Sequence, residues 1–161
     1  MVFATVGSQK FQFDRLLRAL DACAAEGSIP DPVFAQTGAC SYAPQHISYQ
    51  PFLSREEFAK KMEAADVVIT HGGTGAIVGA LKRGKRVVAV PRLAEHGEHV
   101  DDHQVEIVEA FAAAGHIEPC MDAADLAGAY ARAAAREYVP FVSNTEVFLA
   151  DLRGYLEGAV K

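Results

Sequence analysis

The fold is decided by residues 65–91, which read Ala-Asp-Val-Val-Ile-Thr-His-Gly-Gly-Thr-Gly-Ala-Ile-Val-Gly-Ala-Leu-Lys-Arg-Gly-Lys-Arg-Val-Val-Ala-Val-Pro. Asp66 to Thr70 is a short apolar, β-branched run, which predicts a strand buried on both faces of a sheet. Apolar residues at helical spacing predict a helix over Ala76 to Arg83, and Arg86 to Val90 predicts a second buried strand. Together they predict a parallel strand–helix–strand unit with a right-handed crossover.

The loop inside this unit is His71-Gly72-Gly73-Thr74-Gly75, between the carboxyl end of a strand and the amino end of a helix. The first turn of a helix has unpaired N–H groups and a positive dipole end, so the position favours an anion. The glycines allow close approach of the backbone, while Thr74 supplies a hydroxyl and His71 a ring N–H. We expect a phosphate or diphosphate here; the alternative is a tight turn without a ligand.

The spacing of the glycines separates this loop from two familiar phosphate-binding motifs. No Gly-x-x-x-x-Gly-Lys-Ser/Thr pattern is present, so the loop is not a Walker loop. The third glycine of the dinucleotide fingerprint is also missing, because Val78 stands at its position.

Composition limits what such a loop can serve. A chain of 161 residues, half of them hydrophobic, is predicted to form one domain over residues 1–161. The formal charge of −6 argues against a nucleic-acid partner. Three cysteines without metal-ligand spacing predict free thiols and a cytoplasmic protein. Neither a signal peptide nor a membrane span is expected.

The rest of the chain alternates strands with helices, which predicts an α/β fold with a doubly wound parallel sheet of five or six strands. The predicted strands outside the central unit are Val2–Val6, Val33–Thr37, His46–Tyr49 and His116–Glu118. The predicted helices are Phe13–Ala25, one capped by Ser54, one from about Val100 to Gly115, Asp122–Glu137, and Thr145–Leu156 with Val147, Phe148 and Leu152 facing inward.

Ligand sites of such sheets lie outside the carboxyl ends of the strands. Three loops meet that condition: Gly7 to Gln9, which contains Ser8; His71 to Gly75; and Arg92 to Gln104. A pocket between them that holds a diphosphate suits a nucleotide sugar, with Asp102 and Gln104 able to bind sugar hydroxyls.

The third loop is rich in side chains that also bind metals, namely His96, Glu98, His99, Asp102 and His103. It lacks a His-Glu-x-x-His pattern, and convergence of the side chains needs a constrained loop. We expect no metal site, and the alternative explanation of these residues is helix capping with solvated charge.

At this point the residues carry a resemblance. Asp66 to Gly75, Leu81-Lys-Arg-Gly-Lys85, Val87 to Pro91, Asp102-His103-Gln104 and Gly115-His116 resemble the carboxyl-terminal, donor-binding half of family 28 glycosyltransferases. The resemblance implies one Rossmann-like half of a GT-B glycosyltransferase. With its length, the chain is similar to stand-alone subunits of two-part transferases, such as the catalytic subunit of the dolichol-linked N-acetylglucosamine transferase and PssE-like subunits of bacterial exopolysaccharide synthesis.

The resemblance implies roles in the site for the residues that match the motifs of the family. The loop from His71 to Gly75 would hold the donor diphosphate, and Asp102 and Gln104, on either side of His103, match an Asp-x-Gln that contacts the donor sugar. Phe52 and Leu53 lie near the uracil-binding segment of the family. One departure is Gly79, which replaces the acidic residue with which several members bind the ribose hydroxyls.

The function implied is a UDP-sugar-dependent, inverting hexosyltransferase subunit that needs no cofactor. The alternative is a non-catalytic nucleotide-sugar-binding or regulatory subunit. Because a GT-B enzyme has two domains and this chain has the length of one, we expect a separate, membrane-attached acceptor-binding subunit and a lipid-linked saccharide acceptor. The chain is then recruited to the cytoplasmic face of the membrane, with Thr145 to Lys161 as a candidate docking helix, and homo-oligomers fit this expectation.

Overall fold

The computed structural model of the chain describes residues 1–145, 149, 150, 152, 153 and 155. A single sheet of six parallel strands in the order β3-β2-β1-β4-β5-β6 forms its centre. The strands are β1 (Val2–Thr5), β2 (Val33–Gln36), β3 (Ser48–Gln50), β4 (Val67–His71), β5 (Arg86–Val90) and β6 (Glu118–Pro119). The predicted doubly wound parallel sheet is confirmed, and its strand order reverses between β1 and β4.

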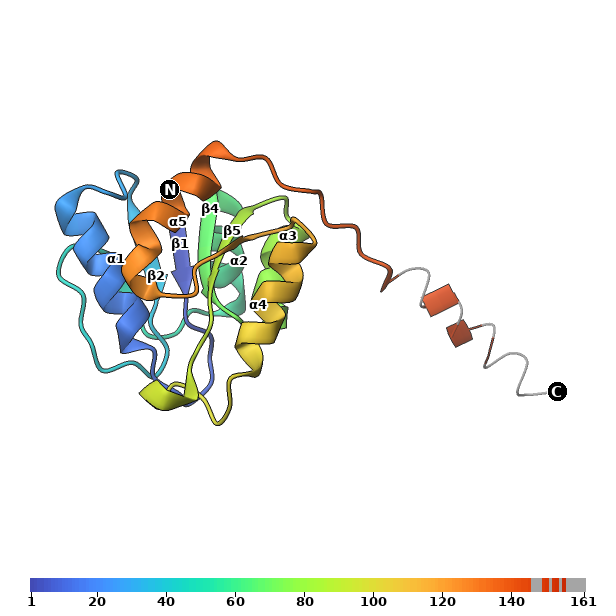
Figure 1. The fold of residues 1–161 in the computed structure, drawn as a ribbon, viewed down its shortest axis with the longest axis horizontal. Coiled ribbons are helices and arrows are strands. Elements are labelled where there is room, and N and C mark those ends of the chain that lie inside the picture. Colours follow the sequence, from blue (N-terminus) through green and yellow to red (C-terminus); the bar gives the residue numbers. More distant parts are fainter. Residues whose placement is uncertain (146–148, 151, 154, 156–161) are drawn as a thin grey trace.

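Helices cover both faces of this sheet (Figure 1). They are α1 (Asp14–Glu26), α2 (Arg55–Ala64), α3 (Thr74–Leu81), α4 (His103–Ala113) and α5 (Leu126–Ala135), with short 3-10 turns η1 (Ala94–His96) and η2 (Ala123–Asp125). One core cluster joins α1 and α5 to one face of the sheet, and the other joins α2, α3 and α4 to the opposite face. Successive residues of a strand alternate between the clusters, because side chains of a strand point to opposite faces.

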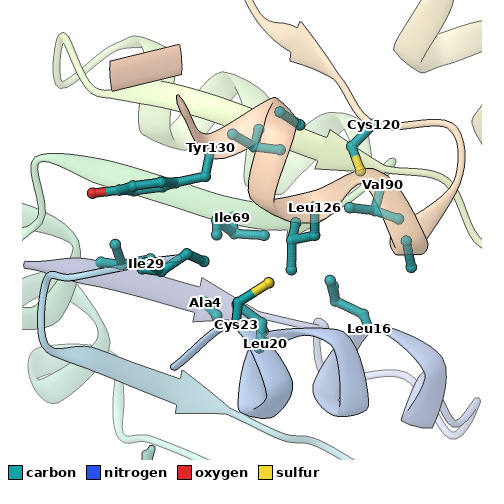
Figure 2. Close-up of a cluster of buried hydrophobic side chains, with 14 of the residues drawn as sticks. Ala4, Leu16, Leu20, Cys23, Ile29, Ile69, Val90, Cys120, Leu126 and Tyr130 are labelled. Carbon is teal, nitrogen blue, oxygen red and sulfur yellow. The ribbon is translucent and has the colours of Figure 1, made fainter. Parts of the chain in front are cut away.

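The core cluster between the sheet and helices α1 and α5 is sealed from solvent. Leu16 and Leu20 of α1 point toward Leu126 of α5, and both helices lie over Ile69 of the central strand β4 (Figure 2). These four side chains have no exposed surface. Burial of this kind contributes about 1.5–3 kcal/mol per large aliphatic side chain, so the two helices hold β1 and β4 side by side.

Local sequence signals fix the ends of several helices. Ser54 and Glu57 form the predicted capping box of α2, in which each side chain accepts the other residue's backbone N–H. Gly27 and Gly115 follow α1 and α4 in the left-handed conformation, with φ of +74° and +75°. The helix expected from about Val100 begins only at His103, because the preceding residues form an irregular loop.

At the end of the chain, the described residues of the helix predicted from Thr145 to Leu156 are helical, but the predicted burial of its apolar side is not confirmed. Val147 and Phe148 lie outside the described residues, and Leu152, expected to face inward, is exposed. Beyond α5 the chain runs away from the body of the domain (Figure 1). No helix among the described residues is long and apolar enough to cross a membrane. Cys23, Cys40 and Cys120 are free, as expected.

Candidate functional site

A pocket of about 650 Å³ opens at the carboxyl edge of the sheet, where the order of the strands reverses. Ligands of doubly wound sheets bind at this switch point because the loops that follow the two central strands part there. The lining residues are Thr5, Gly7, Ser8, Gln9, Gln36, Leu53, Arg55, Phe58, Met62, His71, Gly73, Thr74, Gly75, Ala76, Gly79, Arg83, His99, His103, Gln104 and Ile107.

The amino end of α3 forms one wall of this pocket. Gly73 precedes the helix, and its carbonyl accepts the N–H groups of Ala76 and Ile77. The helix itself provides no acceptor for the N–H groups of Thr74 and Gly75, and its dipole is positive at this end. Thr74 and Gly75 are also exposed, so two amides and one hydroxyl face the pocket.

His71 occupies the switch point itself, at the last position of β4. A Cβ atom at Gly7 would lie 2.8 Å from Cε1 of His71, and one at Gly73 would lie 2.3 Å from its Nε2. Gly7 also has φ of +84°, which favours glycine. The two glycines therefore make room for the imidazole, although they are far apart in the sequence.

Burial keeps this imidazole neutral. Desolvation, and then the positive charge of Arg92, lower the pKa of His71 from 6.5 to about 4, against an opposing hydrogen bond with the backbone of Thr5. His71 therefore offers a neutral ring to the pocket at physiological pH.

Arg92, two residues after the end of β5, joins the loops around the pocket. It is only 2% exposed, and its guanidinium donates to the backbone oxygens of Val6, Phe11, Gln12 and Glu98. The first three carbonyls belong to the segment after β1, and the fourth to the loop after β5. One buried cation thus holds two of the three pocket loops together.

The carboxylate of Glu98 is fully buried beneath the same loops. It accepts from Nε and Nη2 of Arg15 at 3.0 and 2.9 Å, and from the backbone N–H of Leu93 at 3.0 Å. A buried charge of this kind persists only when it is paired and hydrogen-bonded. Glu98 therefore anchors the loop to α1 and does not face the pocket.

Gln104 and Asp102 stand at the start of α4 but serve different groups. Oε1 of Gln104 accepts the backbone N–H of Arg92 at 3.1 Å, which leaves its Nε2 group for the pocket that it lines. Oδ1 of Asp102 accepts the backbone N–H of Ala94 at 2.7 Å, so Asp102 closes the loop outside the pocket.

The pocket brings together most of the residues singled out in the sequence: Gly7, Ser8, Leu53, His71, Gly73, Thr74, Gly75, His103 and Gln104. Three others lie outside it. Phe52 is 52% exposed. Gly72 is buried under α4, where a Cβ atom would lie 2.9 Å from the backbone oxygen of Gln104. Asp102 is the third.

Sequence reasoning missed several lining residues, among them Gln36, Arg55, Phe58, Arg83 and His99. Arg55 and Arg83 carry no local motif, since each is an exposed cation of a helix or its end. Arg92 was also missed. An arginine that follows a buried strand and a proline is unusual so close to a hydrophobic core. Arg55 and Arg83 give the pocket a cationic lining that the acidic composition hides.

The stretch tested for metal ligands splits into separate clusters. His99 and His103 meet at the side chain of Asp101, whereas Glu98 and Asp102 are engaged elsewhere. Asp101 was not among the residues considered from the sequence.

The fold is a doubly wound α/β domain with a pocket, lined by two arginines and three histidines, at its switch point. The chain belongs to glycosyltransferase family 28, because the model of the "Glycosyltransferase family 28 C-terminal domain" matches residues 1–148. The resemblance noted in the sequence is thereby confirmed.

Two curated relatives are both named "UDP-N-acetylglucosamine transferase subunit ALG13". The protein of Yarrowia lipolytica is 34% identical over 71 residues, which cover 44% of this chain and 34% of the relative. The protein of Candida glabrata is 36% identical over 81 residues, which cover 50% of this chain and 39% of the relative. The chain thus spans less than half the length of the relatives it matches.

Two solved structures share the fold. The glycotransferase of kitacinnamycin has a TM-score of 0.58 at 20% identity, over 83% of this chain and 34% of that protein. MurG of Acinetobacter baumannii has a TM-score of 0.53 at 23% identity, over 80% of this chain and 40% of that protein. The prediction of one Rossmann-like half of a GT-B glycosyltransferase is confirmed.

Burial of His71 predicts a specific dependence of stability on pH. Its pKa is lower in the folded chain than in the unfolded chain, so the unfolded state binds more protons between pH 6.5 and 4. Above pH 6.5 the neutral ring carries no such penalty. As the pH falls through this window, the free energy of unfolding measured with urea should decrease by about 1–3 kcal/mol more for the wild type than for His71→Gln. Equal losses in both proteins would contradict a buried neutral His71.

Gly72 and Gly75 offer a matched pair for a stability test. At Gly72 a Cβ atom meets the backbone of Gln104, whereas at Gly75 nothing lies within 4 Å. Gly72→Ala should lower the free energy of unfolding by about 1–3 kcal/mol, while Gly75→Ala should leave it unchanged or slightly higher. Chemical denaturation measures both, and an equal effect of the two changes would contradict the packing of the loop against α4.

Proposed function

We propose that the chain is the donor-binding subunit of a UDP-sugar-dependent, inverting hexosyltransferase. The observation that carries the proposal is the charge of the pocket. Arg55, Arg83 and three histidines line it, and within the described part of the chain no aspartate or glutamate does. In a chain with a formal charge of −6 this separation of charge favours an anionic ligand.

A nucleoside diphosphate matches the arrangement of the lining. The diphosphate would lie on the free amides of α3 with the Thr74 hydroxyl, beside the ring of His71. The uracil would lie toward Leu53, whose backbone N–H is held by Gln36. Gly79 leaves open space where a carboxylate would bind the ribose, and Arg83 borders the same space, so recognition of the ribose would differ from that in several family members.

The sugar would then lie toward α4, where the Nε2 group of Gln104 faces the pocket. Asp102 would act on this region by holding the loop before the helix. As a leaving group, the diphosphate gains negative charge in the transition state, and amides already directed at it stabilise that charge without a metal ion. We therefore propose transfer without a divalent cofactor, with the general base supplied by the acceptor-binding subunit.

The proposed partner is a separate, membrane-attached subunit that binds a lipid-linked saccharide, as in exopolysaccharide or capsule synthesis. Support comes from the relatives, whose names describe subunits, and from apolar side chains exposed beyond α5: Val142 is 84% exposed, and Leu149, Leu152 and Tyr155 are exposed as well. The chain would thus act at the cytoplasmic face of the membrane. A non-catalytic nucleotide-sugar-binding subunit is the alternative, and transfer assays with the partner separate the two.

Donor binding is tested by calorimetric titration of the chain with UDP and a panel of UDP-hexoses in the presence of EDTA. Thr74→Val removes a hydroxyl that bonds a charged oxygen, which should weaken binding about 10–100-fold, and Thr74→Ser should restore it. Gly75→Val should abolish binding while the domain stays folded, because its side chain would project from an unobstructed position into the pocket. Near-normal affinity in Gly75→Val would refute the assignment of the diphosphate site.

Partner dependence is tested by truncating the chain after Ser143. The shortened chain should keep its UDP affinity, since the pocket residues precede this point, but lose co-purification with the membrane subunit and the transfer activity of the pair. Efficient transfer to a lipid-linked acceptor by the full chain alone, in detergent, would show that the partner is unnecessary.

A further inference from the structure

A compact cluster of His99, Asp101 and His103 lies on the loop before α4 and at its first residue. Each offers one ligand atom, and these atoms lie within 4.8 Å of one another. Nδ1 of His99 is 3.2 Å from Oδ1 of Asp101, and Nδ1 of His103 contacts the same oxygen. The two imidazole rings meet edge to face, with centroids 4.7 Å apart.

The loop around the cluster is constrained on both sides. His99 is packed against Phe11, with ring centroids 5.0 Å apart, and its side chain is only 11% exposed. His103 is fixed as the first residue of α4, and its backbone N–H also donates to Asp101. The side chains of Glu98 and Asp102 also hold the loop, because each accepts a backbone N–H from its first residues. The constraint that the sequence did not show is therefore present.

From this geometry we propose that His99, Asp101 and His103 form a binding site for a divalent transition-metal ion such as Zn²⁺. Two imidazole nitrogens and one carboxylate oxygen suit zinc, cobalt or nickel, whereas magnesium and calcium prefer oxygen ligands. In a tetrahedral zinc site with bonds of about 2.0–2.1 Å, the ligand atoms lie roughly 3.3 Å apart, so small movements of the exposed Asp101 and His103 complete the site.

The position of the site gives a bound ion access to the pocket. His99 and His103 line the pocket, whereas Asp101 lies behind them. Three protein ligands leave a fourth position for water or an anion. The site is separate from the amides of α3, so ion binding does not rest on the function proposed above.

Calorimetric titration of the full chain with ZnCl₂ tests the site, without nucleotide, in a non-chelating buffer with the cysteines reduced. The wild type should bind one ion, and Asp101→Asn and His103→Ala should each weaken binding at least tenfold, since losing a ligand costs more than the 10–100-fold typical of outer-shell partners. Circular dichroism checks that the variants fold, and Asp101→Asn is expected to, because this side chain is exposed.

Matched controls come from the same loop and from the thiols. His96→Ala removes a neighbouring histidine outside the cluster, and Cys40→Ser removes the one cysteine that is not buried; both should bind Zn²⁺ as the wild type does. Co²⁺ should give the absorption of a tetrahedral nitrogen and oxygen site that is lost in Asp101→Asn. Absent binding, equal affinity in the wild type and both cluster variants, or an equal loss in His96→Ala would overturn the proposal, as would equally tight Mg²⁺ binding.

Discussion

The pocket depends on one buried guanidinium. Arg92 satisfies backbone oxygens from the segment after β1 and from the loop after β5, so neither loop can move without leaving a buried charge unpaired. Losing one hydrogen bond of a charged group costs about 1.5–3 kcal/mol, because the buried N–H left behind remains desolvated. Its backbone N–H also fixes the amide of Gln104 at the pocket wall. Arg92 therefore shapes the site without being part of its lining.

The pocket differs in charge from the chain as a whole. The chain as a whole is acidic, yet its pocket is lined by cations and imidazoles. The neighbouring acidic side chains are engaged by partners: Glu98 by Arg15, Asp102 by the backbone of Ala94, and Asp101 by His99 and His103. His71, which is partly buried at the switch point, stays neutral because of its desolvation and because of the charge of Arg92. The cations and imidazoles around the pocket favour an anionic ligand.

Local sequence patterns predicted the strands, the helices and the loop from His71 to Gly75, because periodicity reports burial and a glycine reports a turn. They did not predict that Gly7 and Gly73 enclose His71, nor that Arg92 bonds to the segment after β1, because contacts between distant segments leave no local pattern. The assignment of Asp102 to the sugar met the same limit, since the direction of its carboxylate depends on the loop at Ala94. The prediction that Leu152 faces inward was wrong, because an amphipathic pattern indicates an apolar face but not whether this domain covers that face.

In the proposed function a nucleoside diphosphate binds at the switch point, on the amino end of α3. Backbone amide spectra of the ¹⁵N-labelled chain, recorded as UDP is added, test this binding residue by residue. We expect saturable shifts that are largest at Thr74, Gly75 and the side-chain amide of Gln104. Shifts confined to the groove of Gly84, Tyr138 and Phe141, or no saturable shift at residues 73–76, would contradict it.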